Sequence, residues 1–189
     1  MDARRAPVPQ IEQATLMGAK LSFSMELFPP RDGASAAAFQ ETVTRLNTMG
    51  PAFCSVTYGA GGTTRAGTEA ALASLLRLGV AAPAGHLTCA GQTSADVLST
   101  ARRWKAMDIR HVVALRGDGR GGESSLSGAV ELVTALRSMG IPEISVACYP
   151  EIHPRSASRA ADLAYLKRKV EAGAASSLLR CAVGWFVDS

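Results

Sequence analysis

Aromatic residues are scarce in this sequence, at 5% of 189 residues, and long apolar runs are lacking. The scarcity of aromatic side chains favours helices packed closely on a sheet over an aromatic-rich β-sandwich. No apolar run approaches the roughly 20 residues of a membrane span. Arg4 and Arg5 precede a proline-containing segment, where an export signal has an apolar core. We therefore expect a cytoplasmic protein with no membrane segment.

The sequence also has few cysteines and a small net charge. The net charge is only +4, with a pI near 9.1, and no aromatic platform accompanies the basic residues. We therefore expect no nucleic-acid partner. The cysteines Cys54, Cys89, Cys148 and Cys181 form no C-x-x-C pair and are expected to be free thiols, mostly buried in strands. No set of side chains has the spacing of a metal site, so no metal is expected.

What the sequence does contain is a regular alternation of apolar runs and amphipathic segments. Its hydrophobic fraction, 47%, suffices for the core of one domain or of part of a larger one. Strands are predicted at 21–28, 53–58, 81–88, 111–115 and 144–149, and helices at 35–49, 65–78, 93–107, 127–139 and 158–172. Strand–helix units about 30 residues apart imply a parallel sheet covered by helices. Two architectures compete: an open doubly wound sheet and a (β/α)8 barrel.

Polar, titratable residues recur where the predicted strands end. They are Glu26, Thr57, Tyr58, His86, Arg116, Asp118, Tyr149 and His153. Both architectures bind ligands at the carboxyl ends of their strands, so these residues mark the expected site. Glu26 interrupts an apolar strand, either as a solvent-facing carboxylate or as a general acid whose pKa is raised by apolar surroundings. His86 and His153 are either site residues or hydrogen-bonded structural histidines.

The segment GDGRGG, residues 117–122, matches G-x-G-x-x-G, the pattern of a dinucleotide-binding turn. That turn belongs in the first strand–helix unit with its helix starting at once, whereas this segment follows the fourth strand and three residues delay the helix. The informative residues are therefore Arg116 and Asp118. Arg116 offers a fork of donors to a phosphate or carbonyl, and Asp118 can accept from a heterocycle N–H.

Six stretches together carry a family resemblance: SFSMELFPP, FCSVTYGAGGTTR, GHLTC, IRHVVALRGD, VACYPEIHP and ADLAYLKRKVEAGA. From about residue 21 to 174 the chain resembles the flavin-dependent methylenetetrahydrofolate reductases of bacterial type. The resemblance implies a (β/α)8 TIM barrel holding FAD at its C-terminal rim. It also implies hydride transfer from NADH or NADPH, through FAD, to 5,10-methylenetetrahydrofolate, giving 5-methyltetrahydrofolate for one-carbon and methionine metabolism.

The resemblance also implies roles for individual residues. Glu26 and Asp118 match catalytic positions that also contact the folate, with Glu26 as the acid that helps to form the reactive iminium. The implied cofactor-binding residues are Thr57, Tyr58, Ala60, His86, Arg116, Gly117, Asp118, Ala129, Tyr149, His153, Asp162 and Lys169. The expected partner is a small-molecule folate, and assembly into a homo-oligomer stays open.

The chain departs from the family pattern at three places. Gly128 stands where the family has an aromatic residue, and Ser156 replaces a small apolar one. After residue 174 the chain reads ASSLLRCAVGWFVDS, with Arg180 near the position of a family Gln. We therefore expect about five βα units, with the sixth to eighth strands missing through a frameshift or premature stop.

These departures set the expected organisation of the chain. We expect an N-terminal extension at 1–20, the barrel portion at 21–174 and a divergent tail at 175–189. The alternative functions are an inactive truncated fragment of such an enzyme and another α/β flavin-binding protein.

Overall fold

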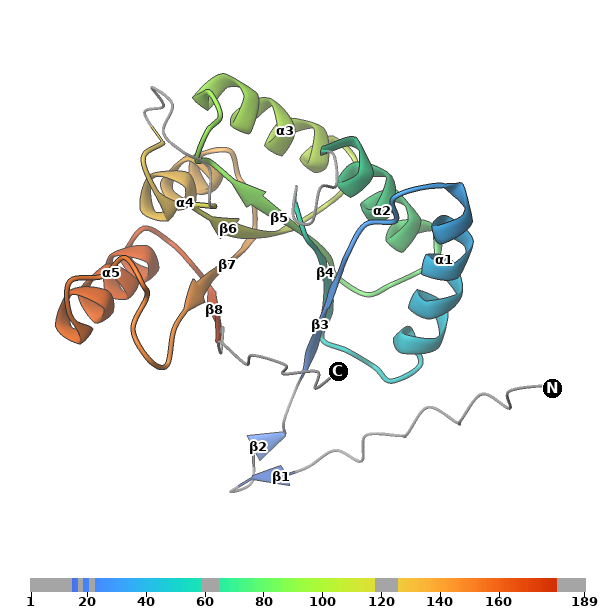
Figure 1. Cartoon of the computed structure of the whole chain (residues 1–189), viewed down its shortest axis with the longest axis horizontal. Coiled ribbons are helices and arrows are strands. Elements are labelled where there is room, and N and C mark those ends of the chain that lie inside the picture. The colour runs from blue at the N-terminus through green and yellow to red at the C-terminus, as the bar shows by residue number, and fades with distance from the viewer. Residues whose placement is uncertain (1–14, 17–18, 21–22, 59–64, 118–125, 180–189) are drawn as a thin grey trace, which may run out of the picture. The chain divides into compact units, whose positions relative to one another are not determined.

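A computed structural model describes residues 15–16, 19–20, 23–58, 65–117 and 126–179 (Figure 1). The chain divides into two compact units, Met1–Ala84 and Gly85–Ser189. None of the helices in the described ranges is long and apolar enough to cross a membrane.

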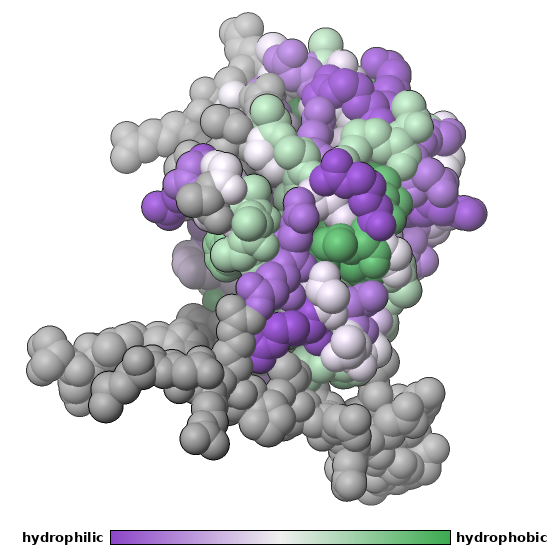
Figure 2. All heavy atoms as spheres, turned by 90° about the vertical axis from the view of Figure 1, so that its right-hand side faces the viewer, coloured by the Kyte–Doolittle hydropathy of each residue, from purple (hydrophilic) through white to green (hydrophobic). Residues whose placement is uncertain are grey.

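The first unit contains two strand–helix units and a short antiparallel strand pair that precedes them. Its elements are β1 (Thr15–Leu16), β2 (Ala19–Lys20), β3 (Ser24–Leu27), α1 (Gly33–Asn47), β4 (Phe53–Val56) and α2 (Arg65–Arg77). Strands β3 and β4 pair in parallel, with Glu26 opposite Ser55. Helix α1 begins at a capping box, because Ser35 N donates to Asp32 Oδ1 at 2.8 Å and Asp32 N donates to Ser35 Oγ at 3.0 Å. Figure 2 views the side of α1, where hydrophilic residues surround smaller apolar areas.

The second unit continues the alternation, and the boundary between the two units falls inside β5. Its elements are β5 (Pro83–Thr88), α3 (Ser94–Ala106), β6 (His111–Leu115), α4 (Ala129–Ser138), β7 (Glu143–Cys148), α5 (Arg159–Glu171) and β8 (Ser176–Leu179). Strands β6, β7 and β8 pair in parallel, and α4 contacts β6 and β7. Leu132, Val133 and Leu136 of α4 are fully buried.

Close helix-on-strand packing in the second unit depends on a glycine. Trp104 of α3 is fully buried, and a Cβ added to Gly85 of β5 would overlap its indole ring. The pairing of a small residue with a large one fills the core at the density of a protein interior. Aromatic scarcity and helix-on-sheet packing therefore go together here, as the composition predicts.

Strand order distinguishes the two predicted architectures. The parallel strands are hydrogen-bonded in the order β3-β4-β5-β6-β7-β8, which is the order of the sequence. A doubly wound sheet reverses its order at a switch point, whereas a (β/α)8 barrel adds each strand next to the last. Over the residues that the structure describes, the fold class is therefore an incomplete (β/α)8 barrel with five strand–helix units, as expected.

One expectation about the fold is wrong. The sixth strand was expected to be missing, yet β8 lies parallel to β7, with Ser145 opposite Ser176. The expectation rested on a missing sequence motif, whereas a strand needs only backbone pairing and a compatible pattern, which Ser176–Leu179 provide. The predicted boundaries at residues 20 and 174 stay predictions.

Candidate active site

In the first unit, the ends of β3 and β4 carry three of the predicted site residues. Thr57 and Tyr58 are buried, and the backbone of Thr57 is satisfied: its N–H donates to Leu27 O at 3.0 Å and its carbonyl accepts from Thr68 Oγ1 at 2.9 Å. The Thr57 hydroxyl, by contrast, is buried without a hydrogen-bond partner among the described residues. Such a group costs about 1–3 kcal/mol when left unpaired. It marks a place where a ligand would restore the missing bond.

Glu26 projects from the same strand ends. Its side chain is exposed, although Leu27 beside it is buried. This exposure agrees with the solvent-facing alternative for its placement and leaves the carboxyl accessible to a substrate. Its role as an acid stays a prediction. Ala60 lies outside the described residues.

In the second unit, the ends of β5 and β6 are tied together through the backbone. Arg116 O accepts from Cys89 N at 3.2 Å and from Ala90 N at 2.8 Å. Gly117 then turns with φ +82°, and a Cβ added there would lie 2.8 Å from Thr88 Cβ. Only glycine therefore suits this position, both for its backbone conformation and for its close approach to β5.

The polar side chains of this strand end differ in their surroundings. His86 is buried in β5. Arg116 is half-buried, and its Nη1 donates to Gly117 O at 3.1 Å, so the guanidinium folds over its own turn. Its remaining N–H groups are suited to an anionic or carbonyl ligand. Asp118 lies outside the described residues, as does Arg180.

Beyond β7, the predicted residues Tyr149, His153 and Asp162 form a connected cluster. The rings of Tyr149 and His153 meet edge to face, with centroids 4.7 Å apart. His153 N donates to Asp162 Oδ2 at 3.3 Å, and His153 Nδ1 accepts from Arg155 N at 3.1 Å. Because Nδ1 is an acceptor, the neutral ring carries its proton on Nε2. That nitrogen is then the donor which His153 can offer to a ligand.

Lys169 completes this cluster from helix α5. Its side chain is buried, and Nζ donates to Ala147 O on β7. Burial lowers the pKa of Lys169, while the nearby Asp162 and Cys148 act in the opposite direction. A buried ammonium is costly unless it is paired, so a negatively charged ligand at this place would be stabilised.

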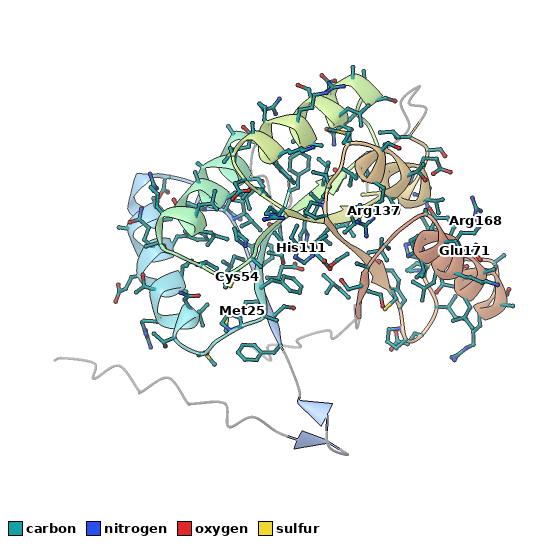
Figure 3. The ribbon with its side chains drawn as sticks, turned by 180° about the vertical axis from the view of Figure 1, so that it is seen from behind. Met25, Cys54, His111, Arg137, Arg168 and Glu171 are labelled. Carbon is teal, nitrogen blue, oxygen red and sulfur yellow. The ribbon has the colours of Figure 1, made fainter. Side chains whose placement is uncertain are left out.

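The start of α4 reveals a residue that sequence reasoning missed. Ala129 N donates to the hydroxyl of Tyr165 at 3.1 Å. Tyr165 lies three residues after Asp162 and four before Lys169, so the three share a face of α5. That spacing was visible in the sequence, but the resemblance assigned no role to position 165. Arg168, labelled on α5 in Figure 3, lies with its guanidinium carbon 5.5 Å from the Tyr165 ring centroid.

The structure also describes three of the cysteines and Ser156. Cys54 and Cys89 are buried free thiols, as expected, and Cys148 is a half-buried one. Among the described residues, no group of three or more His, Cys, Asp or Glu side chains is placed to hold a metal ion. Ser156 lies in the turn after β7, where its N–H donates to His153 O at 2.8 Å.

Comparison with known proteins identifies the family. Residues 10–178 match the family model described as methylenetetrahydrofolate reductase. The 5,10-methylenetetrahydrofolate reductase of Escherichia coli is 42% identical over 159 residues, which cover 82% of this chain and 53% of that protein. The enzyme of Pectobacterium carotovorum is 40% identical over 85% of this chain and 54% of its own length.

A plant relative extends the comparison. Methylenetetrahydrofolate reductase (NADH) 1 of Arabidopsis thaliana is 34% identical over 185 residues, covering 88% of this chain and 31% of that protein. The chain spans about half the length of the bacterial relatives. The family match and the relatives agree with the parallel strands, which follow one another in sequence order. The chain therefore belongs to the methylenetetrahydrofolate reductase family.

Proposed function

We propose that this chain binds FAD and reduces 5,10-methylenetetrahydrofolate to 5-methyltetrahydrofolate, with NADH or NADPH as the electron donor. The observation that carries the proposal is the cluster of Tyr149, His153, Asp162 and Lys169. Family membership implies all four as cofactor residues, and they converge at the end of β7 through ring, hydrogen-bond and charge contacts.

Each of the two units, taken by itself, holds residues that fit part of a flavin dinucleotide. The buried Thr57 hydroxyl lacks a partner among the described residues, so a ligand atom can complete its hydrogen bonding. Arg116 and Lys169 supply positive charge at strand ends, where a pyrophosphate would be neutralised. When bound, FAD supplies the relay that passes a hydride from the nicotinamide to the folate.

Glu26 has the central role among the chain's own residues in the proposed reaction. As the methylene bridge of the folate opens to the iminium, the nitrogen that leaves the bridging carbon takes a proton, which Glu26 supplies. The iminium carbon then accepts a hydride, so one proton and one hydride are consumed for each methyl group formed. The exposure of Glu26 is compatible with direct access to the substrate.

The site would act in the cytoplasm, where the free thiols Cys54, Cys89 and Cys148 stay reduced. A second candidate is flavin binding without turnover, in which the cluster at the end of β7 holds the cofactor but no folate is reduced. One experiment distinguishes the reductase from a protein that only binds flavin.

Purified protein is reconstituted with FAD, freed of excess cofactor and mixed anaerobically with NADH or NADPH. Loss of the visible flavin absorbance, followed by its return on addition of 5,10-methylenetetrahydrofolate, supports the reductase. Bound flavin that neither nucleotide bleaches supports the binding-only alternative. Protein that retains no flavin contradicts both.

A further inference from the structure

Gln92 lies in the turn between β5 and α3, here called the β5 turn (residues 88–92), and its side chain folds back onto the end of β5. Its Nε2 donates to Thr88 O at 2.8 Å and to Thr88 Oγ1 at 3.1 Å. A carbonyl oxygen can only accept, so the amide nitrogen, which carries two N–H donors, must be the atom that faces Thr88. Only 9% of Gln92 is exposed, so the amide is held in place by its surroundings.

Thr88 supports the neighbouring turn at the end of β6, here called the β6 turn (Arg116 and Gly117). A Cβ added to Gly117 would lie 2.8 Å from Thr88 Cβ and 3.0 Å from Thr88 Cγ2. The Thr88 side chain therefore packs directly against the backbone of Gly117. Because threonine is β-branched, its χ1 angle decides which of its atoms face Gly117. The hydrogen bond from Gln92 to Thr88 Oγ1 favours one of these orientations.

The backbone joins the same two turns. Arg116 O accepts from Cys89 N at 3.2 Å and from Ala90 N at 2.8 Å. Gln92 N also donates to Cys89 O, at 3.3 Å, which makes the β5 turn compact. The β6 turn thus rests on the β5 turn through two backbone hydrogen bonds and the Thr88 side chain, and the Gln92 side chain closes the β5 turn.

We propose that Gln92 is a positioning residue for the cofactor, because it fixes the place of the β6 turn through Thr88. The proposal rests on the proposed function, which assigns Arg116 and Gly117 to FAD. Gln92 acts through Thr88 and not by contact with the ligand. Its amide orients the Thr88 side chain, and Thr88 sets how closely Gly117 approaches β5. The Arg116 guanidinium, which donates to Gly117 O, moves with this turn.

The test compares two substitutions that nearly keep the volume of Gln92. Gln92→Met removes the amide donors, and Gln92→Glu replaces the amide with a carboxyl group, which donates only when it is protonated. Gln40→Met, the same change at an exposed glutamine of α1, is the control. FAD dissociation constants of the full chain are measured by flavin fluorescence at about pH 8 and about pH 5, on either side of neutrality. Each is expressed relative to the wild-type chain at the same pH, and thermal unfolding without FAD is followed in parallel.

Gln92→Met is expected to weaken FAD binding about 3- to 10-fold at both pH values, the effect of about one lost hydrogen bond. Gln92→Glu should be at least as weak at the higher pH, because an ionised carboxylate repels Thr88 O. Burial favours the uncharged form of a carboxyl group, so at the lower pH this variant should donate to Thr88 O and regain most of the wild-type affinity. Gln40→Met should leave the affinity unchanged.

Thr88→Val is a second route to the same contact, and it applies even if Gln92→Met does not fold. Valine keeps the branched shape that packs against Gly117 but cannot accept from Nε2 of Gln92. Because the bond to Thr88 O remains, the loss of FAD affinity should be smaller, about 2- to 3-fold. Wild-type affinity in Thr88→Val would show that the hydroxyl does not transmit the effect of Gln92.

Three further results overturn the proposal. If Gln92→Met lowers the unfolding temperature but keeps the wild-type affinity, the amide only stabilises the β5 turn. If Gln92→Glu binds FAD as weakly at the lower pH as at the higher one, donation to Thr88 O does not position the β6 turn. If the wild-type chain binds no FAD, the proposed function fails first and the role of Gln92 fails with it, a pattern distinct from the other two because the wild type itself is affected.

Discussion

The Arg137 side chain of α4 is predicted to hold the turns before β7 and β8 in place, and its removal should cost about 2 kcal/mol of stability. Its Nε donates to Gly173 O at 2.6 Å, and its Nη1 donates to Pro142 O at 2.8 Å and to Ile141 O at 3.2 Å (Figure 3). The guanidinium therefore ties α4 to the turn before β7 and to the turn before β8.

The magnitude follows from these contacts. Hydrogen bonds from a charged group contribute about 1.5–3 kcal/mol each when buried. Arg137 is half-buried and one of its bonds is long, so solvent screening reduces the sum to about 2 kcal/mol. For a chain of this size, the change corresponds to a fall of about 4–8 °C in unfolding temperature.

The assay is thermal unfolding of Arg137→Ala followed by circular dichroism, with Arg102→Ala, an exposed arginine on α3, as the matched control. Arg137→Lys should lose about half as much, because a single amine cannot reach carbonyls on both sides of the guanidinium. A loss of unfolding temperature in Arg137→Ala no larger than that in Arg102→Ala would show that the guanidinium does not stabilise these turns.

The remaining predictions concern glycines and a buried histidine. Gly85→Ala should destabilise the protein by about 1–3 kcal/mol, because the new methyl group would overlap Trp104. Gly33→Ala is the control and should be close to neutral, because nothing lies within 4 Å of its Cβ position. Equal urea midpoints for the two variants would count against the close packing of Gly85 on Trp104. Gly117→Ala should cost about 1–3 kcal/mol, because φ +82° is strained for alanine, and should also weaken FAD binding; an unchanged affinity would show that this turn does not shape the site. Burial lowers the pKa of His111, opposed by Glu143, so the folded state favours the neutral ring. Stability should therefore be complete above about pH 6.5 and be lost as the pH falls from there through the folded pKa; urea midpoints against pH should show this decline, and His111→Asn should reduce it.

The strand–helix order was predictable because its signals are local. Apolar runs and helical spacing placed all ten predicted elements. Local contacts also fix the helix starts, as in α3, where Thr93 Oγ1 accepts from Asp96 N at 3.1 Å. Strand β8 was missed because its pairing is long-range. Ser176 hydrogen-bonds Ser145, which also bonds His111 across β6, β7 and β8, and no local pattern signals that chain of contacts.

How far the positions of the candidate site residues could be predicted differs from one strand end to the next. The cluster at the end of β7 follows from the resemblance, which named its members without showing their contacts. The contact of Tyr165 with the start of α4 was not predicted. It depends on the packing of α4 against α5, which the sequence of neither helix alone indicates. For Glu26, the sequence left two placements open, and the exposed side chain agrees with the solvent-facing one.

Anaerobic flavin spectroscopy of the reconstituted chain tests the proposed reductase activity most directly. NADH or NADPH is expected to bleach the bound flavin, and 5,10-methylenetetrahydrofolate is expected to restore its colour. 5-Methyltetrahydrofolate should accumulate in an amount equal to that of the flavin reoxidised. Glu26→Gln should bleach normally and fail to regain colour. A flavin that is bleached but never reoxidised by the folate, in the wild-type chain, would contradict the proposed reductase activity.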